Sequence, residues 1–189
     1  TETNSADANV FGEVLREVVT SYPAESYGLV LFSHASGWMP EGSYNRSSLL
    51  SVVVDKQAEM EIADLARAIP QNMFEYIIFE ACHMAGIEVA YELKDKTKYL
   101  VASSTEIVSP GFTAIYGEWG SELLNNKPIN FIHHAYTWFT NQTNYMKSAS
   151  FSVIETKKLK PLAQFIYENC NWNQVINIDG LQNFDRNSN

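Results

Sequence analysis

Two short apolar runs, neither interrupted by a charge, constrain the fold of this chain more than any other feature. Residues 27–32 read YGLVLF and residues 76–79 read YIIF. An apolar run of this length without polar alternation is typical of a β-strand buried on both faces, as in a parallel sheet. Parallel strands are joined by long crossover connections, which are usually helices. The chain is therefore expected to alternate strands with helices.

The spacing of the other apolar residues predicts the remaining elements. Helical periodicity occurs at residues 10–22, 60–69, 87–93, 119–124, 129–139 and 159–167. Further strand-like segments lie at residues 50–54, 99–102 and 150–154. Polar residues 36–48 and the residues after Asn171 are expected to form irregular structure. This order predicts an α/β fold with three layers, αβα, and a mainly parallel sheet covered by helices on both faces.

Length and composition are those of a single folded domain spanning residues 1–189. A chain of 189 residues can bury a proper core, and 46% hydrophobic residues indicate a packed protein and not a disordered one. No apolar run approaches the roughly 20 residues that a membrane-spanning helix needs. The sequence begins at Thr1 with neither methionine nor a leader, so we expect a processed N-terminus from which any export signal has been removed.

Charge and cysteine content narrow the possible functions. The net charge of −9 argues against a nucleic-acid partner, because phosphate binding relies on clustered lysine and arginine. An acidic domain favours basic substrates. The two cysteines, Cys82 and Cys170, stand in very different contexts. We interpret Cys82 as a reactive thiol and Cys170 as a thiol in the core.

Cys82 and His34 each follow the carboxyl end of an expected buried strand. Catalytic groups of open α/β sheets gather at that edge. If the two strands are parallel neighbours, both side chains emerge at one edge of the sheet. A thiolate attacks far better than a thiol, and a nearby imidazolium or helix N-terminus favours the thiolate. The helix expected after Cys82 supplies such an N-terminus, and His34 can protonate a departing amine as general acid.

Taken singly, both residues have a simpler interpretation. A lone cysteine at a strand end is more often a small buried hydrophobe, and a lone histidine in a loop usually has no special role. Together, residues 27–34 (YGLVLFSH) and 79–84 (FEACHM) resemble the clostripain family of cysteine peptidases, which belongs to the caspase-like clan. The similarity continues through residues 88–93 and 99–104 and extends from about Phe11 to about Ile166.

The resemblance implies a caspase-like peptidase with His34 and Cys82 as its catalytic dyad. The backbone N–H groups of Cys82 and of Ala35, after the histidine, would form the oxyanion hole. Members of the family favour arginine or lysine before the cleaved bond, and the acidic residue two positions before the nucleophile helps to bind it. That residue is Glu80 here, and Glu106 is a candidate for a second acidic group. A structural role for Glu80, bonded to local backbone or to an arginine, remains the alternative.

The chain departs from the family pattern in three ways. Ala35 replaces a glycine, which adds a methyl group and resists positive φ. Glu80 replaces aspartate and reaches one methylene further. Relatives begin with a strand-helix region and continue further at the end of their chain, and this sequence has no counterpart of either region. We therefore expect this chain to be a processed or truncated portion of a family member, or a short member. A companion chain from the same precursor is then expected to complete its sheet. Because Ala35 replaces this glycine, the alternative to an active peptidase is a catalytically impaired family member that acts as a peptide-binding or scaffold module. A third possible function is that of a different cysteine hydrolase, such as an amidase.

Self-cleavage is a further expectation drawn from the relatives, which are cut after a basic residue in the loop following the histidine. Arg46 lies in a polar stretch suited to such a cut, and an ordinary exposed arginine is the alternative.

Neither a metal nor another cofactor is expected, because adjacent His133 and His134 point about 100° apart on a helix. The expected partners are peptide or protein substrates. The expected location is the periplasm, the surface or the exterior of a bacterium.

Overall fold

Helices and strands alternate along the chain, as the apolar pattern predicts. The computed structural model describes residues 4–35, 37, 53–55 and 58–171. Its elements are α1 (Ala8–Ser21), β1 (Gly28–Phe32), β2 (Val53–Asp55), β3 (Ala58–Met60), α2 (Ile62–Ala68), β4 (Phe74–Glu80), α3 (Ile87–Glu92), β5 (Thr97–Ala102), α4 (Thr113–Leu124), α5 (Pro128–Thr140), β6 (Ser152–Glu155) and α6 (Leu159–Asn169). No helix among these described elements is long and apolar enough to cross a membrane.

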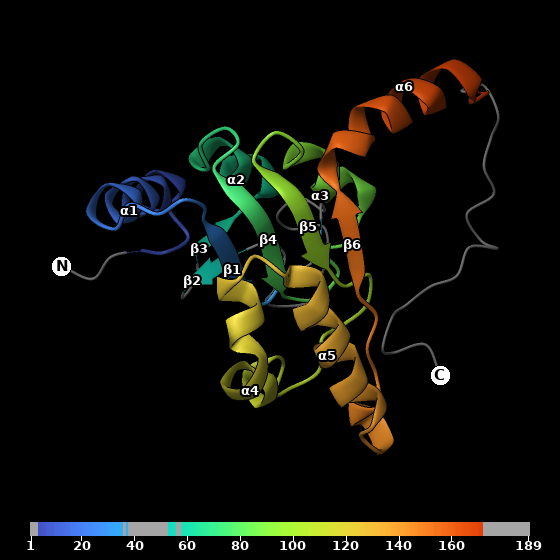
Figure 1. Ribbon diagram of the computed structural model, residues 1–189. Coiled ribbons are helices and arrows are strands. Elements are labelled where there is room, and N and C mark those ends of the chain that lie inside the picture. The colour runs from blue at the N-terminus through green and yellow to red at the C-terminus, as the bar shows by residue number, and fades with distance from the viewer. Residues whose placement is uncertain (1–3, 36, 38–52, 56–57, 172–189) are drawn as a thin grey trace.

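The central sheet has four strands in the order β1-β4-β5-β6 (Figure 1). β1, β4 and β5 run parallel, and β6 pairs antiparallel with β5. The two apolar runs that predict buried strands are β1 and β4, and they are direct neighbours in register from Gly28 opposite Tyr76 to Phe32 opposite Glu80. The expected α/β fold with a mainly parallel sheet is therefore confirmed.

Successive residues of β4 enter two separate cores on opposite faces of the sheet. Ile77 and Phe79 pack in one core with residues of α1, α2, α3 and α6. Tyr76 and Ile78 pack in the other core, beneath α4 and α5. Figure 1 shows α4 and α5 on one side of the sheet, with α2 and α3 on the other. All four of these strand residues are 6% exposed or less, as expected for a strand covered on both faces.

Several boundaries differ from the expectation. Met60 belongs to β3, which pairs with β2 in a small antiparallel sheet, and the helix after it begins only at Ile62. Helix α4 begins at Thr113, ahead of the expected 119. The first helix begins at Ala8 because the Asp7 carboxylate accepts the N–H groups of Asn9 and Val10 and caps it. The three-residue strand β3 is too short for period-2 alternation to identify.

Phe131 holds the core beneath α4 and α5 together, and its removal is expected to be costly. Its ring is fully buried and lies 5.5 Å from the rings of both Phe112 and Tyr116, measured between centroids. Phe131→Ala should lower the free energy of unfolding by about 3–5 kcal/mol, measured by chemical denaturation. Leu124→Ala is the control: that side chain is 88% exposed, so a change beyond about 0.5 kcal/mol is not expected. Equal losses in the two variants would contradict this assignment of the core.

Candidate active site

His34 and Cys82 occupy equivalent positions beyond two paired strands. The last paired residues of β1 and β4 are Phe32 and Glu80, and each candidate residue stands two positions further along. The pairing continues past the strands, because the Ser33 N–H donates to the Glu80 carbonyl oxygen at 3.5 Å. The same edge of the sheet thus carries both residues, as expected for parallel neighbouring strands.

The backbone after His34 runs beside the backbone after Cys82. Gly37 has a φ of +82°, and a Cβ atom built on it would lie 2.9 Å from the His83 carbonyl oxygen. A side chain at this position would therefore be strained both by φ and by the neighbouring carbonyl. Ala35, which lies between His34 and Gly37 in the sequence, is buried, whereas the His34 side chain is exposed. An exposed imidazole at a sheet edge is available to a bound molecule.

A backbone amide from a third segment points at the Cys82 sulfur. The Ile107 N–H donates to Cys82 Sγ with a nitrogen–sulfur distance of 3.4 Å. Residue 107 belongs to the segment 103–112, which joins β5 to α4 and is also held by the hydrogen bond from the His83 N–H to the Thr105 carbonyl, at 3.1 Å. Such a donor stabilises negative charge on sulfur. Cys82 itself is half-buried, so its sulfur is neither sealed in the core nor fully exposed.

The expected helix N-terminus at Cys82 is absent. Helix α3 begins at Ile87, with Gly86 as its N-cap, and has six residues. A turn separates it from the cysteine, and a helix dipole acts mainly within its first turn. The stabilising donor observed at the sulfur is the Ile107 amide instead.

Glu80 is buried and hydrogen-bonded. Its side chain is 4% exposed. One carboxylate oxygen accepts the Phe112 N–H at 2.5 Å and the other accepts the Tyr116 hydroxyl at 2.6 Å. Burial raises the pKa of the Glu80 carboxyl, and these two hydrogen bonds lower it in part. Among the described residues, no lysine or arginine pairs with Glu80, so both of its donors are neutral groups.

Comparison with known proteins assigns the family. A family model described as the clostripain family matches residues 1–171. The chain belongs to the clostripain family. Its fold is that of the C11 proteases, with an inactive zymogen from Parabacteroides distasonis at 31% identity and a TM-score of 0.69. A secreted C11 cysteine protease from Bacteroides thetaiotaomicron, in complex with an irreversible peptide inhibitor, has 28% identity and a TM-score of 0.66.

These two similarities span most of this chain and less than half of each of the two solved proteins. The zymogen aligns with 86% of this chain and 43% of its own, and the secreted protease with 88% and 49%. None of the curated proteins matches the chain. The resemblance read from YGLVLFSH and FEACHM is thus confirmed at the level of the family, whereas the roles of individual residues remain predictions.

The sequence of this clostripain-family chain singled out three more residues, Glu106, Arg46 and Cys170. Glu106 lies half-buried in the same 103–112 segment as Ile107. Arg46 lies outside the described residues. Cys170, interpreted above as a core thiol, is exposed at the end of α6, so that interpretation is wrong. Its apolar neighbours in sequence lie on a helix of which only Leu159 is buried, and helical periodicity alone did not reveal this.

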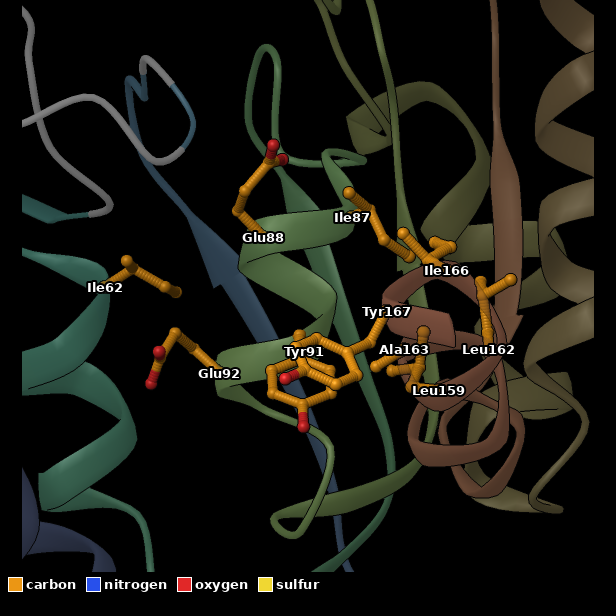
Figure 2. A pocket seen from close by; sticks show the side chains of 10 residues that line it. All are labelled: Ile62, Ile87, Glu88, Tyr91, Glu92, Leu159, Leu162, Ala163, Ile166 and Tyr167. Atoms are coloured by element: carbon orange, nitrogen blue, oxygen red, sulfur yellow. The ribbon is translucent and has the colours of Figure 1, made fainter. Parts of the chain in front are cut away.

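An apolar groove of about 560 Å³ lies elsewhere on the molecule, between α2, α3 and α6 (Figure 2). Figure 2 shows Tyr91 of α3 and Tyr167 of α6 among the side chains that line it, with Leu162 and Ile166 also on α6. None of the predicted site residues lines it. The groove is therefore not part of the candidate active site.

Sequence reasoning missed the contacts made by the segment 103–112. The Ile107 and Phe112 donors are backbone amides, which every residue except proline carries, so no sequence signal marks them. Tyr116 is one of ten tyrosines in the chain and carries no distinguishing motif. The Pro110-Gly111 pair does signal a turn in this region, and that turn brings the Phe112 amide to Glu80.

Proposed function

We propose that this chain is the catalytic part of a cysteine endopeptidase in which Cys82 is the nucleophile and His34 its partner. The observation that supports this most is the register of β1 and β4. It brings the two positions beyond Phe32 and Glu80 to one edge of the sheet. Membership of the clostripain family supports the same reaction class.

The proposed reaction proceeds through a thioester. The Cys82 thiolate, stabilised by the Ile107 N–H, attacks the carbonyl carbon of the scissile peptide bond. The Ala35 and Cys82 N–H groups, which donate to no other group within the described part of the chain, are the proposed donors to the oxyanion. His34 protonates the departing amine as the C–N bond breaks. Water then adds to the thioester, its proton goes to His34, and the carboxylic acid and thiolate are released.

The proposed specificity is for arginine or lysine before the cleaved bond. Glu80 is a buried carboxylate whose donors are all neutral, so its negative charge lacks a cationic partner among the described residues. A substrate guanidinium or ammonium would supply that partner, since a carboxylate accepts more hydrogen bonds than the two observed. Glu106 is the proposed second acidic group. The net charge of −9 favours the approach of basic peptides.

A panel of fluorogenic peptides tests the proposal. Peptides ending in arginine, lysine, aspartate or a neutral residue are offered to the purified protein, and release of the fluorophore is followed. Turnover of the arginine and lysine peptides, with little turnover of the others, supports the endopeptidase. Binding of these peptides without turnover would instead favour the impaired peptide-binding module, for which the substitution at Ala35 is the reason. Turnover of small amides but of no peptide would favour an amidase.

Self-cleavage between Arg46 and Ser47 is part of the proposal. The expected result of incubating the purified protein is two fragments, with the new N-terminus at Ser47, because a cleavage site in a polar stretch is readily reached by an active site. Mass spectrometry of the intact protein and of its fragments measures the cut. Arg46→Ala and Cys82→Ala should each prevent it. A cut that persists in the Cys82→Ala protein would show a contaminating protease and overturn the prediction.

Location and assembly complete the proposal. One solved relative is a secreted protease of Bacteroides thetaiotaomicron, and we place this chain outside the bacterial cytoplasm by analogy. Within the described residues β1 pairs on one side only, with β4. An unpaired strand edge offers hydrogen-bonding groups to another strand. A companion segment from the same precursor is proposed to pair there.

A further inference from the structure

The Glu80 carboxylate joins the end of β4 to the beginning of α4. Both of its donors, the Phe112 N–H at 2.5 Å and the Tyr116 hydroxyl at 2.6 Å, belong to the residues at that helix start. Burial and the adjoining Glu80 raise the pKa of Tyr116, so its hydroxyl keeps the proton that it donates. Hydrogen bonds to a charged group are about twice as strong as those between neutral groups. These two hydrogen bonds to the carboxylate, called the Glu80 anchor below, therefore fix the C-terminal end of the segment 103–112.

Gly111 permits this anchor. Its φ is +63°, and a Cβ atom at this position would lie 2.2 Å from Glu80 Oε1. The Gly111 N–H donates to the Val108 carbonyl at 2.9 Å and closes the turn that presents the next amide to Glu80. Any side chain here would have to displace the carboxylate. The close approach of the backbone at residue 111 to the Glu80 carboxylate therefore requires a glycine at this position.

The other part of the same segment lies against the residues around Cys82. The Ala85 N–H donates to the Ser103 carbonyl at 3.0 Å, and the His83 N–H donates to the Thr105 carbonyl at 3.1 Å. Between these contacts and the Glu80 anchor lies Ile107, whose N–H donates to the Cys82 sulfur at 3.4 Å. The amide at the sulfur is therefore held from both sides, and Glu80 provides one of the two attachments.

We propose that Glu80 is a positioning residue that, through Gly111 and Phe112, holds the Ile107 N–H against the sulfur of Cys82. This inference rests on the proposed role of Cys82 as nucleophile, and it adds to Glu80 a role that is independent of any bound substrate. A carboxylate released from Phe112 would let the segment move, and the sulfur would lose its donor. The reactivity of the thiol then depends on a side chain that does not contact it.

Alkylation by iodoacetamide measures this effect without a peptide substrate. The rates at Cys82 and Cys170 are determined in one sample at neutral pH by mass spectrometry, and exposed Cys170 serves as the internal reference. Glu80→Ala and Gly111→Ala should each slow alkylation of Cys82 by about tenfold, the size expected for a lost hydrogen bond to a charged group. The rate at Cys170 should not change. Gly117→Ala is the control, because a Cβ placed there would meet no atom within 4 Å beyond its chain neighbours and the nearby backbone of its own helix.

Two further variants separate positioning from general damage to the fold. Glu80→Gln retains an oxygen that can accept the Phe112 N–H, so it should restore much of the rate that Glu80→Ala loses. Tyr116→Phe removes only one donor and should slow Cys82 less than Glu80→Ala does. Circular dichroism establishes which variants are folded. A folded Glu80→Ala or Tyr116→Phe protein in which Cys82 reacts at the wild-type rate would overturn the proposal.

Failure of the proposed function gives a different pattern. If Cys82 reacts quickly in the wild type and slowly in the Glu80→Ala protein while no peptide is hydrolysed, the peptidase proposal fails and the positioning of the thiol stands. If peptides are hydrolysed and the Glu80→Ala protein alkylates normally at Cys82, the peptidase stands and the positioning role fails.

Discussion

Cys82→Ala is expected to reduce hydrolysis of arginine peptides by roughly 10⁴-fold or more, because removing a covalent nucleophile leaves only substrate binding and oxyanion stabilisation. No other group can form the thioester at this position, and Cys170 lies exposed at the far end of α6. The measurement is kcat/KM for a fluorogenic arginine peptide. Substrate binding, measured by competition with an unlabelled peptide, should change little.

The control for this prediction is the second cysteine. Cys170→Ala removes an exposed thiol at the C-cap of α6 and should leave kcat/KM unchanged. His34→Ala should also reduce the rate strongly, since the departing amine then lacks its general acid. Activity retained in Cys82→Ala, or lost in Cys170→Ala, would contradict the assignment of the nucleophile.

Glu80→Gln is expected to lower kcat/KM for arginine peptides by about a hundredfold or more while affecting neutral peptides much less. The substitution keeps the shape of the side chain and removes the charge. Removing one partner of a buried charge pair is expensive, because the other charge remains buried without compensation. That cost falls only on a substrate that carries a cation. The measurement is the ratio of kcat/KM for matched arginine and neutral peptides.

Two other acidic residues serve as comparisons. Glu106→Gln should lower the same ratio if Glu106 is the second acidic group, and by less than Glu80→Gln because Glu106 is less buried. Glu92→Gln, on the exposed side of α3, should not change the ratio. An equal loss for every substrate in the Glu80→Gln protein would exclude a charge partnership with the substrate and leave only the positioning role.

Much of the fold can be predicted from apolar patterning because its central strands are buried on both faces. Residues 27–32 and 76–79 have no polar alternation, and they correspond to β1 and β4 in the sheet. A strand-like segment is expected at residues 50–54, but β3 and its pairing with β2 could not be predicted this way, since a three-residue strand has no measurable periodicity. The antiparallel direction of β6 is likewise set by tertiary pairing with β5.

Only those residues of the candidate site that follow the ends of buried strands could be predicted from the sequence. His34 and Cys82 stand out because the carboxyl ends of parallel strands share an edge. The Ile107 amide and the Phe112 amide belong to a connection whose path depends on the folded structure, and their donor groups are common to all backbones. The burial of Glu80 follows from the same path, because α4 and its preceding turn cover that carboxylate.

Covalent labelling tests most directly whether the sulfur of Cys82 and the imidazole of His34 act together at one bound carbonyl. The protein is treated with a peptidyl arginine chloromethyl ketone, and the modified residue is identified by peptide mapping and mass spectrometry. We expect a single adduct on Cys82, none on Cys170, and much slower labelling in the His34→Ala protein. An adduct on Cys170 in place of Cys82, or labelling of Cys82 that is equally fast without His34, would contradict this expectation.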